Sequence, residues 1–264
     1  AGWIQSIGLH LFLMGLLVWM LPLLDQSENP LIKFFRNWYI IFAFPFLYWD
    51  VGGYIQLVFP QLFDPAILKL EKTLFGVLPN IWVQQYVSPV LTEIMQISYG
   101  IYWLTIPMGA AIFYFRRELF LFNELLRAIT FTFFLCYFIF IFFPVAGPRF
   151  FLADRITADY HSYFVGNFLR SFVKDAGFRG GAFPSSHVAV AVVILLFVWR
   201  FRPNTAILLF LPMVIALSLS TVYGQYHYAV DVIAGLLLGV VLGLAAAEWT
   251  AGRLGKQNGK NSAY

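Results

Sequence analysis

Charged side chains are scarce in this chain: only 11% of its 264 residues are Asp, Glu, Lys or Arg, against about 25% in a typical soluble domain. Hydrophobic residues make up 61% of the sequence and aromatic residues 20%. Apolar runs recur that are long enough to cross a bilayer, which takes roughly 20 residues of helix. The shortage of charge excludes an ordinary soluble domain. The composition predicts an all-α fold, a polytopic transmembrane helical bundle.

Cysteine and several common catalytic motifs are also nearly or wholly missing. The one cysteine, Cys136, lies inside an apolar run and excludes an intrachain disulfide. The chain has no acidic cluster resembling a two-metal site, no P-loop and no GxSxG motif. We therefore predict no metal and no cofactor. The lysines and arginines lie beside apolar runs, which also disfavours nucleic acid as a partner.

The apolar runs predict six to seven membrane spans, depending on whether the first run crosses fully. The last run carries three glycines, Gly235, Gly239 and Gly243, on a face that permits close helix contact. Glu124 and Arg127, near the start of the fourth run, are spaced to form an ion pair on a helix. The predicted spans cover residues 3–24, 38–59, 90–115, 119–143, 185–201, 205–222 and 227–248.

Residues 62–87 differ from these spans because three charges between Lys69 and Lys72 interrupt the apolar residues. Gly76 and Pro79 would break a continuous helix. Such a pattern is typical of an amphipathic helix lying in the membrane interface, with aromatic residues at headgroup depth. We expect an interfacial helix here, although a simple connector packed on the bundle is the plainer alternative.

Two short polar islands interrupt the apolar sequence, FPSSH at 183–187 and HYAVD at 227–231. His227 and Asp231 are four residues apart, so a helix would place them on one face. The carboxylate could then accept one imidazole proton and leave the other ring nitrogen nucleophilic. Taken alone, such a pair is more often a buried structural contact.

The first island begins an apolar run, and Ser185 is a natural N-cap for its helix. The free amides of the first turn and the helix dipole would hold an anion, and Ser185 and Ser186 add hydroxyl donors. The plainer alternative is a capped helix whose histidine meets lipid headgroups. Since the fifth span leaves this face of the membrane and the sixth returns to it, His187 and His227 lie at one depth. Together with nearby arginines, the set predicts phosphoryl transfer.

Orientation follows from the basic residues of the short loops. These loops alternate along the chain, so they share one face, which the positive-inside rule assigns to the cytoplasm. The long hydrophilic break at 144–184 and both islands then face away from it. We predict an integral protein of the bacterial inner (plasma) membrane whose site faces the periplasm or exterior. The loop cations are Lys33, Arg36, Arg116, Arg117, Arg200, Arg202, Arg253, Lys256 and Lys260.

The sequences GGAFPSSH and STVYGQYHYAVDVIAG resemble the second and third motifs of the type-2 phosphatidic acid phosphatase superfamily. The usual second motif is PSGH, and Ser186 replaces its glycine. In the third motif Ser220, His227 and Asp231 match the spacing, but Thr221 stands where arginine is common. The first motif is degenerate: only Arg149 matches, and position 142, where its lysine would fall, is Phe. The LEKTLFGVLP stretch also looks like the branch that contains inositol phosphorylceramide synthase.

The resemblance implies a lipid phosphate phosphatase that acts through a phosphohistidine on a lipid phosphate or diphosphate. His227 would form the phosphohistidine, Asp231 would orient it, and His187 would be the general acid. Phosphate would be bound by Arg149, Ser185 and Ser186, and we expect Arg179 or another loop cation to replace a missing motif cation. The sequence predicts four divisions. They are N-terminal spans (1–60), an interfacial segment (61–88), a catalytic transmembrane core (89–250) and a flexible cytoplasmic tail (251–264).

Two other functions stay open. One is a phosphotransferase that moves a phospho-headgroup between lipids, as the synthases of this superfamily do. The other is a transporter without turnover, which Asp50 and Glu93 inside predicted spans would fit. The expected partners are a lipid phosphate substrate and membrane lipids, and homo-oligomer formation is left open.

Overall fold

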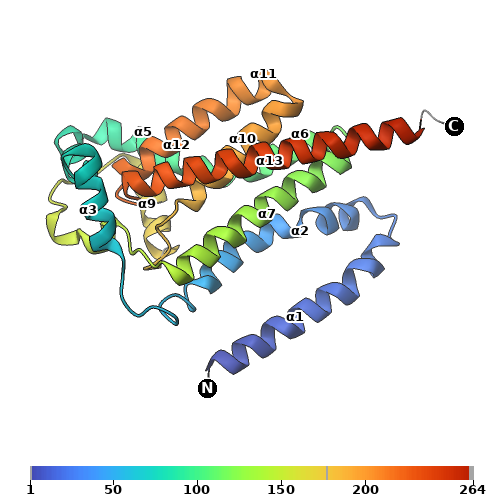
Figure 1. Ribbon diagram of the computed structural model, residues 1–264, viewed down its shortest axis with the longest axis horizontal. Coiled ribbons are helices and arrows are strands. Elements are labelled where there is room, and N and C mark those ends of the chain that lie inside the picture. The colour runs from blue at the N-terminus through green and yellow to red at the C-terminus, as the bar shows by residue number, and fades with distance from the viewer. Residues whose placement is uncertain (1, 177, 262–264) are drawn as a thin grey trace. The chain divides into compact units, whose positions relative to one another are not determined.

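A computed structural model of the chain describes residues 2–176 and 178–261. These residues form helices joined by short connections, and no strand occurs among them, which confirms the all-α prediction (Figure 1). The chain divides into two compact units, Ala1–Leu47 and Tyr48–Tyr264. The polar islands and the loop between them belong to the second unit.

The first unit contains α1 (Gly2–Asp25) and most of α2 (Pro30–Val51). α2 begins and ends earlier than the predicted span at 38–59. Its start is fixed by Pro30, which suits the first turn of a helix, and by Asn29, whose Oδ1 accepts a hydrogen bond from the Leu31 amide at 2.9 Å. An ion pair between Arg36 and Asp25 joins the two helices.

The second unit is built around α10 (Ser186–Phe201) and α13 (Ala229–Asn261), which lie side by side (Figure 1). A Cβ atom at Gly235 would come within 2.6 Å of the Ser185 carbonyl oxygen, and one at Gly239 within 2.7 Å of the Ala189 carbonyl oxygen. The glycine face therefore lets the two backbones touch, as predicted. Ser185 precedes α10 and meets the first turns of α13, so both helices start at the same end.

Five further helices pack on this pair or on one another. α7 (Leu119–Phe142) contacts both α10 and α13, and α6 (Tyr102–Tyr114) contacts α7 and α10. α5 (Pro89–Gly100) packs against α12 (Leu211–Tyr223) and against α9 (Phe164–Ala176). The remaining short elements are α4 (Pro79–Trp82), η1 (Val83–Tyr86), α8 (Pro148–Phe151), η2 (Ala153–Arg155), α11 (Pro203–Thr205) and η3 (Ala206–Phe210).

Four of the described helical segments are long and apolar enough to cross a membrane, fewer than the six to seven spans predicted. The predicted span at 90–115 is divided at Ile101 into α5 and α6, because apolar composition does not reveal where a helix bends. α10 is apolar but has only 16 residues. The four segments are Gly8–Asp25, Leu119–Phe142, Pro203–Tyr223 and Ala229–Gln257.

The predicted interfacial segment forms α3 (Asp64–Phe75), which ends at Gly76 in the left-handed region with φ of 72°. The break foreseen at Gly76 and Pro79 is thus confirmed. Two of its acidic side chains face inward and one of its leucines faces outward: Asp64 and Glu71 are fully buried against the protein, whereas Leu74 is 58% exposed. The helix therefore directs two carboxyl groups toward the body of the second unit.

Basic residues meet carboxylates at the end of the second unit opposite the islands. Glu118 pairs with Arg202, and Glu124 pairs with Arg253 and with Arg127, the last as predicted. The start of α7 and the ends of α10 and α13 therefore lie together. α13 itself is helical to Asn261, well into the region predicted as a flexible tail from 251 onward.

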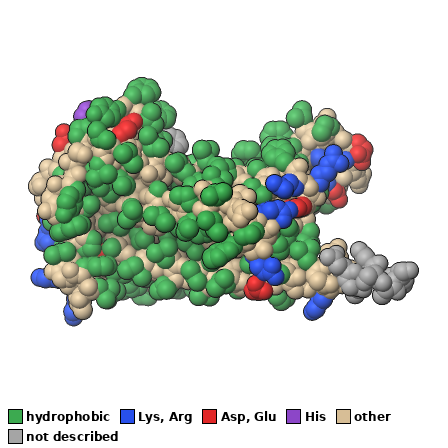
Figure 2. All heavy atoms as spheres, turned by 90° about the horizontal axis from the view of Figure 1, so that it is seen from above, with side chains coloured by type: hydrophobic (Ala, Val, Ile, Leu, Met, Phe, Trp, Pro, Cys, Tyr) green, Lys and Arg blue, Asp and Glu red, His purple; other side chains and the backbone are tan. Residues whose placement is uncertain are grey.

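Hydrophobic side chains cover most of the face seen in Figure 2, with few charged residues among them. On α7, Phe131, Phe134 and Phe138 are each more than half exposed. Burial of such side chains contributes about 1.5–3 kcal/mol each, so their exposure to water would be costly. A surface of this kind indicates contact with lipid, in keeping with an integral membrane protein.

Candidate active site

The two island histidines, 40 positions apart in the sequence, meet in the second unit. The ring centroids of His187 and His227 are 5.7 Å apart with an interplanar angle of 63°. The backbone amide of Ser185 donates to the carbonyl oxygen of Asp231 at 2.9 Å, which ties the start of α10 to the first turn of α13. The predicted juxtaposition of the two histidines is therefore present.

His227 is 4% exposed and lies in the turn before α13. Its Nδ1 lies 2.9 Å from the carbonyl oxygen of Ala182. A carbonyl can only accept, so Nδ1 carries the proton and Nε2 keeps its lone pair. Burial, with a smaller contribution from the charge of Arg149, lowers the pKa of His227 to about 4. The ring is neutral at physiological pH, which is the form a nucleophile needs.

Asp231 lies beside His227, as their spacing predicted, but does not hydrogen-bond to its ring in this structure. Its Oδ2 is 3.6 Å from Nδ1 of His227, too far for a hydrogen bond, and accepts instead from the Tyr228 amide at 2.8 Å. The carbonyl of Ala182, not the carboxylate, fixes the His227 tautomer. Asp231 is fully buried, and its Oδ1 has no partner among the described residues. It remains close enough to stabilise positive charge on the imidazole.

His187, in the first turn of α10, is surrounded by tyrosines that the sequence did not single out. The hydroxyl of Tyr99 lies 3.2 Å from Nε2 of His187, and the ring of Tyr102 lies 4.5 Å from the imidazole centroid. The ring of Tyr48 lies edge-on to the imidazole, with 6.2 Å between the ring centroids. Nδ1 of His187 is buried without a partner among the described residues. Unsatisfied buried nitrogens are rare and mark catalytic groups or sites for a bound molecule.

The predicted phosphate-binding residues divide into two sets. Ser185 and Ser186 are buried, and Ser185 Oγ caps α10 by accepting from the Val188 amide at 3.4 Å, as predicted. Arg149 is half-buried, and its guanidinium carbon lies 4.6 Å from the centre of the Phe150 ring. Arg179 is exposed and approaches the same ring at 5.4 Å. Both predicted cations therefore flank one aromatic side chain.

Asp64 of α3 is a buried hydrogen-bond acceptor for three groups near the histidines, a role that the sequence analysis did not predict. Its Oδ2 accepts from the Ala146 amide at 2.8 Å, and its Oδ1 accepts from the Gly147 amide at 3.0 Å and the Tyr228 hydroxyl at 2.9 Å. These bonds fix the segment that leads into Arg149 and the residue that follows His227. The acid in FDPAIL has no sequence signature beyond its place at a helix start.

The segment that Asp64 fixes, residues 145–147, is also bonded to Ala182, whose carbonyl oxygen accepts from His227. Val145 and Ala182 are joined by a backbone bond of 2.9 Å from the Ala182 amide to the Val145 carbonyl oxygen. Asn80, fully buried, donates to the carbonyl oxygens of His227 and Val222 at 3.1 and 3.0 Å. Backbone and amide contacts from four separate segments therefore set the position of the nucleophilic ring.

Glu93, considered above as an intramembrane charge, has a structural use. Its Oε2 accepts from the amides of Tyr163 and Gly166 at 2.9 and 3.0 Å, which satisfies free donors at the start of α9. Among residues 2–176 and 178–261, no group of three or more His, Cys, Asp or Glu side chains is placed to bind a metal ion.

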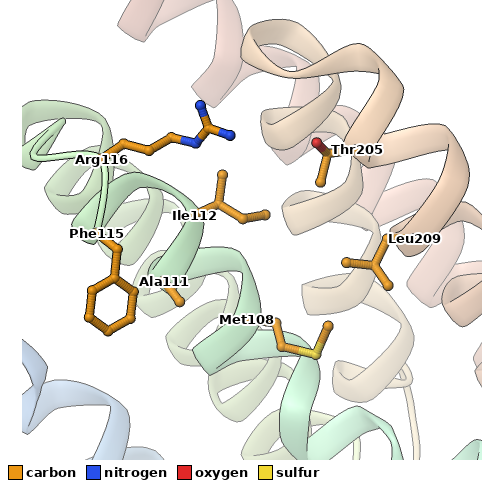
Figure 3. A pocket seen from close by; sticks show the side chains of 7 residues that line it. All are labelled: Met108, Ala111, Ile112, Phe115, Arg116, Thr205 and Leu209. Carbon is orange, nitrogen blue, oxygen red and sulfur yellow. The ribbon is translucent and has the colours of Figure 1, made fainter.

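A cavity of about 510 Å³ lies away from the histidines, near the end of α10. Figure 3 shows its walls, which come from the last turns of α6 and from the segment that begins at Thr205. Apolar side chains and the single cation Arg116 line it. None of the predicted site residues contributes to this cavity.

Comparison with known protein families gives a match to this chain. A family model described as the PAP2 superfamily matches residues 65–245, more than half of the chain. The matched region begins in α3, includes both polar islands and ends within α13. Searches of curated proteins and of solved structures found no match.

Proposed function

Because the chain belongs to the PAP2 superfamily, whose members are generally phosphatases or phosphotransferases, we propose that it is a lipid phosphate phosphatase. The pairing of His187 with His227 carries this proposal. One ring is neutral with its Nδ1 proton held by a carbonyl, so its Nε2 lone pair is available to phosphorus. The other ring keeps a buried nitrogen outside any hydrogen bond to the described residues, available for proton transfer.

In the first half-reaction, Nε2 of His227 forms a bond to phosphorus as the bond from phosphorus to the lipid oxygen breaks. His187, whose protonated form is favoured by the negative charge of the bound phosphate, gives its proton to that oxygen, which leaves as an alcohol. Arg149 and the free amides at the start of α10 stabilise the charge on the remaining phosphoryl oxygens. The buried carboxylate of Asp231 offsets the positive charge that develops on the His227 ring.

In the second half-reaction, water attacks the phosphohistidine. His187, now neutral, accepts a proton from the water, and the bond between phosphorus and Nε2 breaks to release phosphate. Proton and charge are then restored to their starting positions. By the charge of the short loops, we assign this site to the face of the membrane away from the cytoplasm.

The test is to incubate the purified protein in detergent or nanodiscs with a lipid phosphate, with and without an alcohol acceptor. We expect inorganic phosphate to be released without the acceptor. Strict dependence on the acceptor would show that an alcohol, not water, discharges the intermediate, and the protein would then be a phosphotransferase. Absence of any turnover under both conditions would favour a binding or transport role.

Vanadate provides a second, independent prediction. As a pentavalent anion it resembles phosphorus during attack by a histidine nitrogen, and such mimics bind more tightly than substrates. We expect micromolar vanadate to inhibit phosphate release competitively, measured as a rise in the apparent KM. Full activity at millimolar vanadate would count strongly against attack by His227.

A further inference from the structure

The cavity of about 510 Å³ at the end of the second unit opposite the histidines has the volume of a ligand site, which is usually about 300–1,000 Å³. We call it the α6–α12 cavity. One wall is formed by the last two turns of α6, and the other by the start of the apolar segment Pro203–Tyr223. α10 contacts both walls. The cavity is open to the surface, so a lipid molecule beside the helices can enter it.

Both walls of the α6–α12 cavity change from apolar to polar in the same direction. On α6, Met108 and Ile112 are four residues apart and share one face, and Arg116 follows one turn later. On the opposite wall, Thr205 precedes Leu209 by four residues. Figure 3 shows the Arg116 guanidinium and the Thr205 hydroxyl at one end of the cavity and the Met108 side chain at the other. A phospholipid has the same arrangement, with a polar head group joined to an apolar chain.

The polar end of the cavity lies at the ends of two apolar helices. Thr205 is in the first turn of a segment that is long and apolar enough to cross a membrane, and Arg116 lies just beyond the end of α6 at Tyr114. Polar and charged residues in these positions are typical of the membrane–water interface. The phosphate of a phospholipid lies at the same depth.

The two polar groups at this end are not used to hold the fold together. Among the described residues Arg116 has no ion-pair or hydrogen-bond partner, whereas the nearby Glu118 is paired with Arg202. The Thr130 hydroxyl donates to the carbonyl oxygen four residues earlier, as threonines in helices commonly do. The Thr205 hydroxyl makes no such bond within the described part of the chain. Both groups are therefore available to a ligand.

We propose that the α6–α12 cavity binds an anionic phospholipid, with its phosphate at Arg116 and Thr205 and part of an acyl chain along Met108 and Leu209. Phosphate oxygens accept hydrogen bonds from a guanidinium and from a hydroxyl. A zwitterionic lipid would bring its ammonium group close to an arginine, and the described lining contains no carboxylate to offset it. This site is separate from the histidines and does not rest on the proposed function.

A lipid in this cavity would join two helices whose other ends reach the histidines. α6 begins at Tyr102, whose ring centroid lies 4.5 Å from that of His187, and α12 ends at Tyr223, four residues before His227. A ligand that binds only the folded protein raises its unfolding temperature by mass action. The bound lipid should therefore stabilise the second unit against unfolding.

Native mass spectrometry of the full chain in detergent resolves the binding of single lipid molecules. Titration with phosphatidylglycerol and with phosphatidylcholine of the same acyl chains separates the effect of charge from that of the chain. We expect phosphatidylglycerol to bind about fivefold more tightly, which is the attraction of one arginine for anionic lipid near a membrane surface. The unfolding temperature should rise with the same preference. Arg116→Ala should abolish the preference, and Arg116→Lys should keep part of it.

Arg117→Ala is the matched control, because it removes the same charge from an adjacent exposed residue that does not line the cavity. It should retain the preference. Ala111→Phe fills the apolar part of the cavity and should weaken the binding of both lipids. Equal affinities for the two lipids, or an equal loss in Arg116→Ala and Arg117→Ala, would refute the proposal. A dimer that Ala111→Phe abolishes would place a second copy of the chain in the cavity and also refute it. None of these outcomes depends on phosphate release.

Discussion

His227→Ala is expected to lower kcat for a lipid phosphate by at least about 10⁴-fold, because it removes the atom that bonds to phosphorus. His187→Ala should cost about 10²–10⁴-fold, the usual contribution of a general acid. The measurement is phosphate release by purified protein reconstituted in nanodiscs. His161, an exposed loop histidine, supplies the control: His161→Ala should retain the activity of the unsubstituted chain.

The two histidines can be told apart by the leaving group. An aryl phosphate leaves without needing a proton, so His187→Ala should recover much of its activity on that substrate, whereas His227→Ala should not. Asp231→Asn should be milder than either, since the Ala182 carbonyl still holds the His227 tautomer. Equal activity of His227→Ala and the unsubstituted chain on any lipid phosphate would exclude the phosphohistidine.

Asp64→Ala is also expected to cause a large loss of activity and stability, although Asp64 touches no reacting atom. The substitution leaves two amides and the Tyr228 hydroxyl without their buried acceptor. Each such group costs about 1–3 kcal/mol, so thermal unfolding should occur at a clearly lower temperature. In the fraction that stays folded, displacement of Arg149 and His227 by about 1 Å should reduce kcat by about 10²-fold.

Asp64→Asn separates positioning from stability. The amide can accept only through one oxygen, so one of its present donors faces an NH₂ group. At a temperature where this variant is fully folded, kcat should fall and the Kd for inorganic phosphate should rise, since both His227 and Arg149 are displaced. Asp154→Asn, at an exposed acidic residue, should change neither quantity. If Asp64→Asn alters only the unfolding temperature, Asp64 is a structural residue and not a positioning one.

The sequence predicted most of the features that depend on the type and spacing of particular side chains. His187 and His227 were found from two polar islands and the alternation of spans, and the Ser185 cap and the α13 glycines were read correctly from local rules. The structure adds what composition cannot encode. The partner of His227 is a backbone carbonyl, and any residue at position 182 would provide one.

Other differences have equally physical causes. Glu71 was among the charges that predicted an interfacial helix, but tertiary contacts turn it, and Asp64, into the protein. The alternation of apolar and charged residues does not predict which side of such a helix packs against the bundle. The break at Ile101 lies within a run that hydropathy alone assigns to one span, and only packing distinguishes the two helices.

The glycine contact between α10 and α13 bears on how the protein tolerates its surroundings. Two backbones in direct contact have no intervening side chains to compress or rotate. A change in bilayer thickness or lateral pressure that tilts one helix should carry the other with it. The spacing of the imidazoles would then be insulated from lipid composition, while the surrounding loops stay free to diverge and accept other substrates.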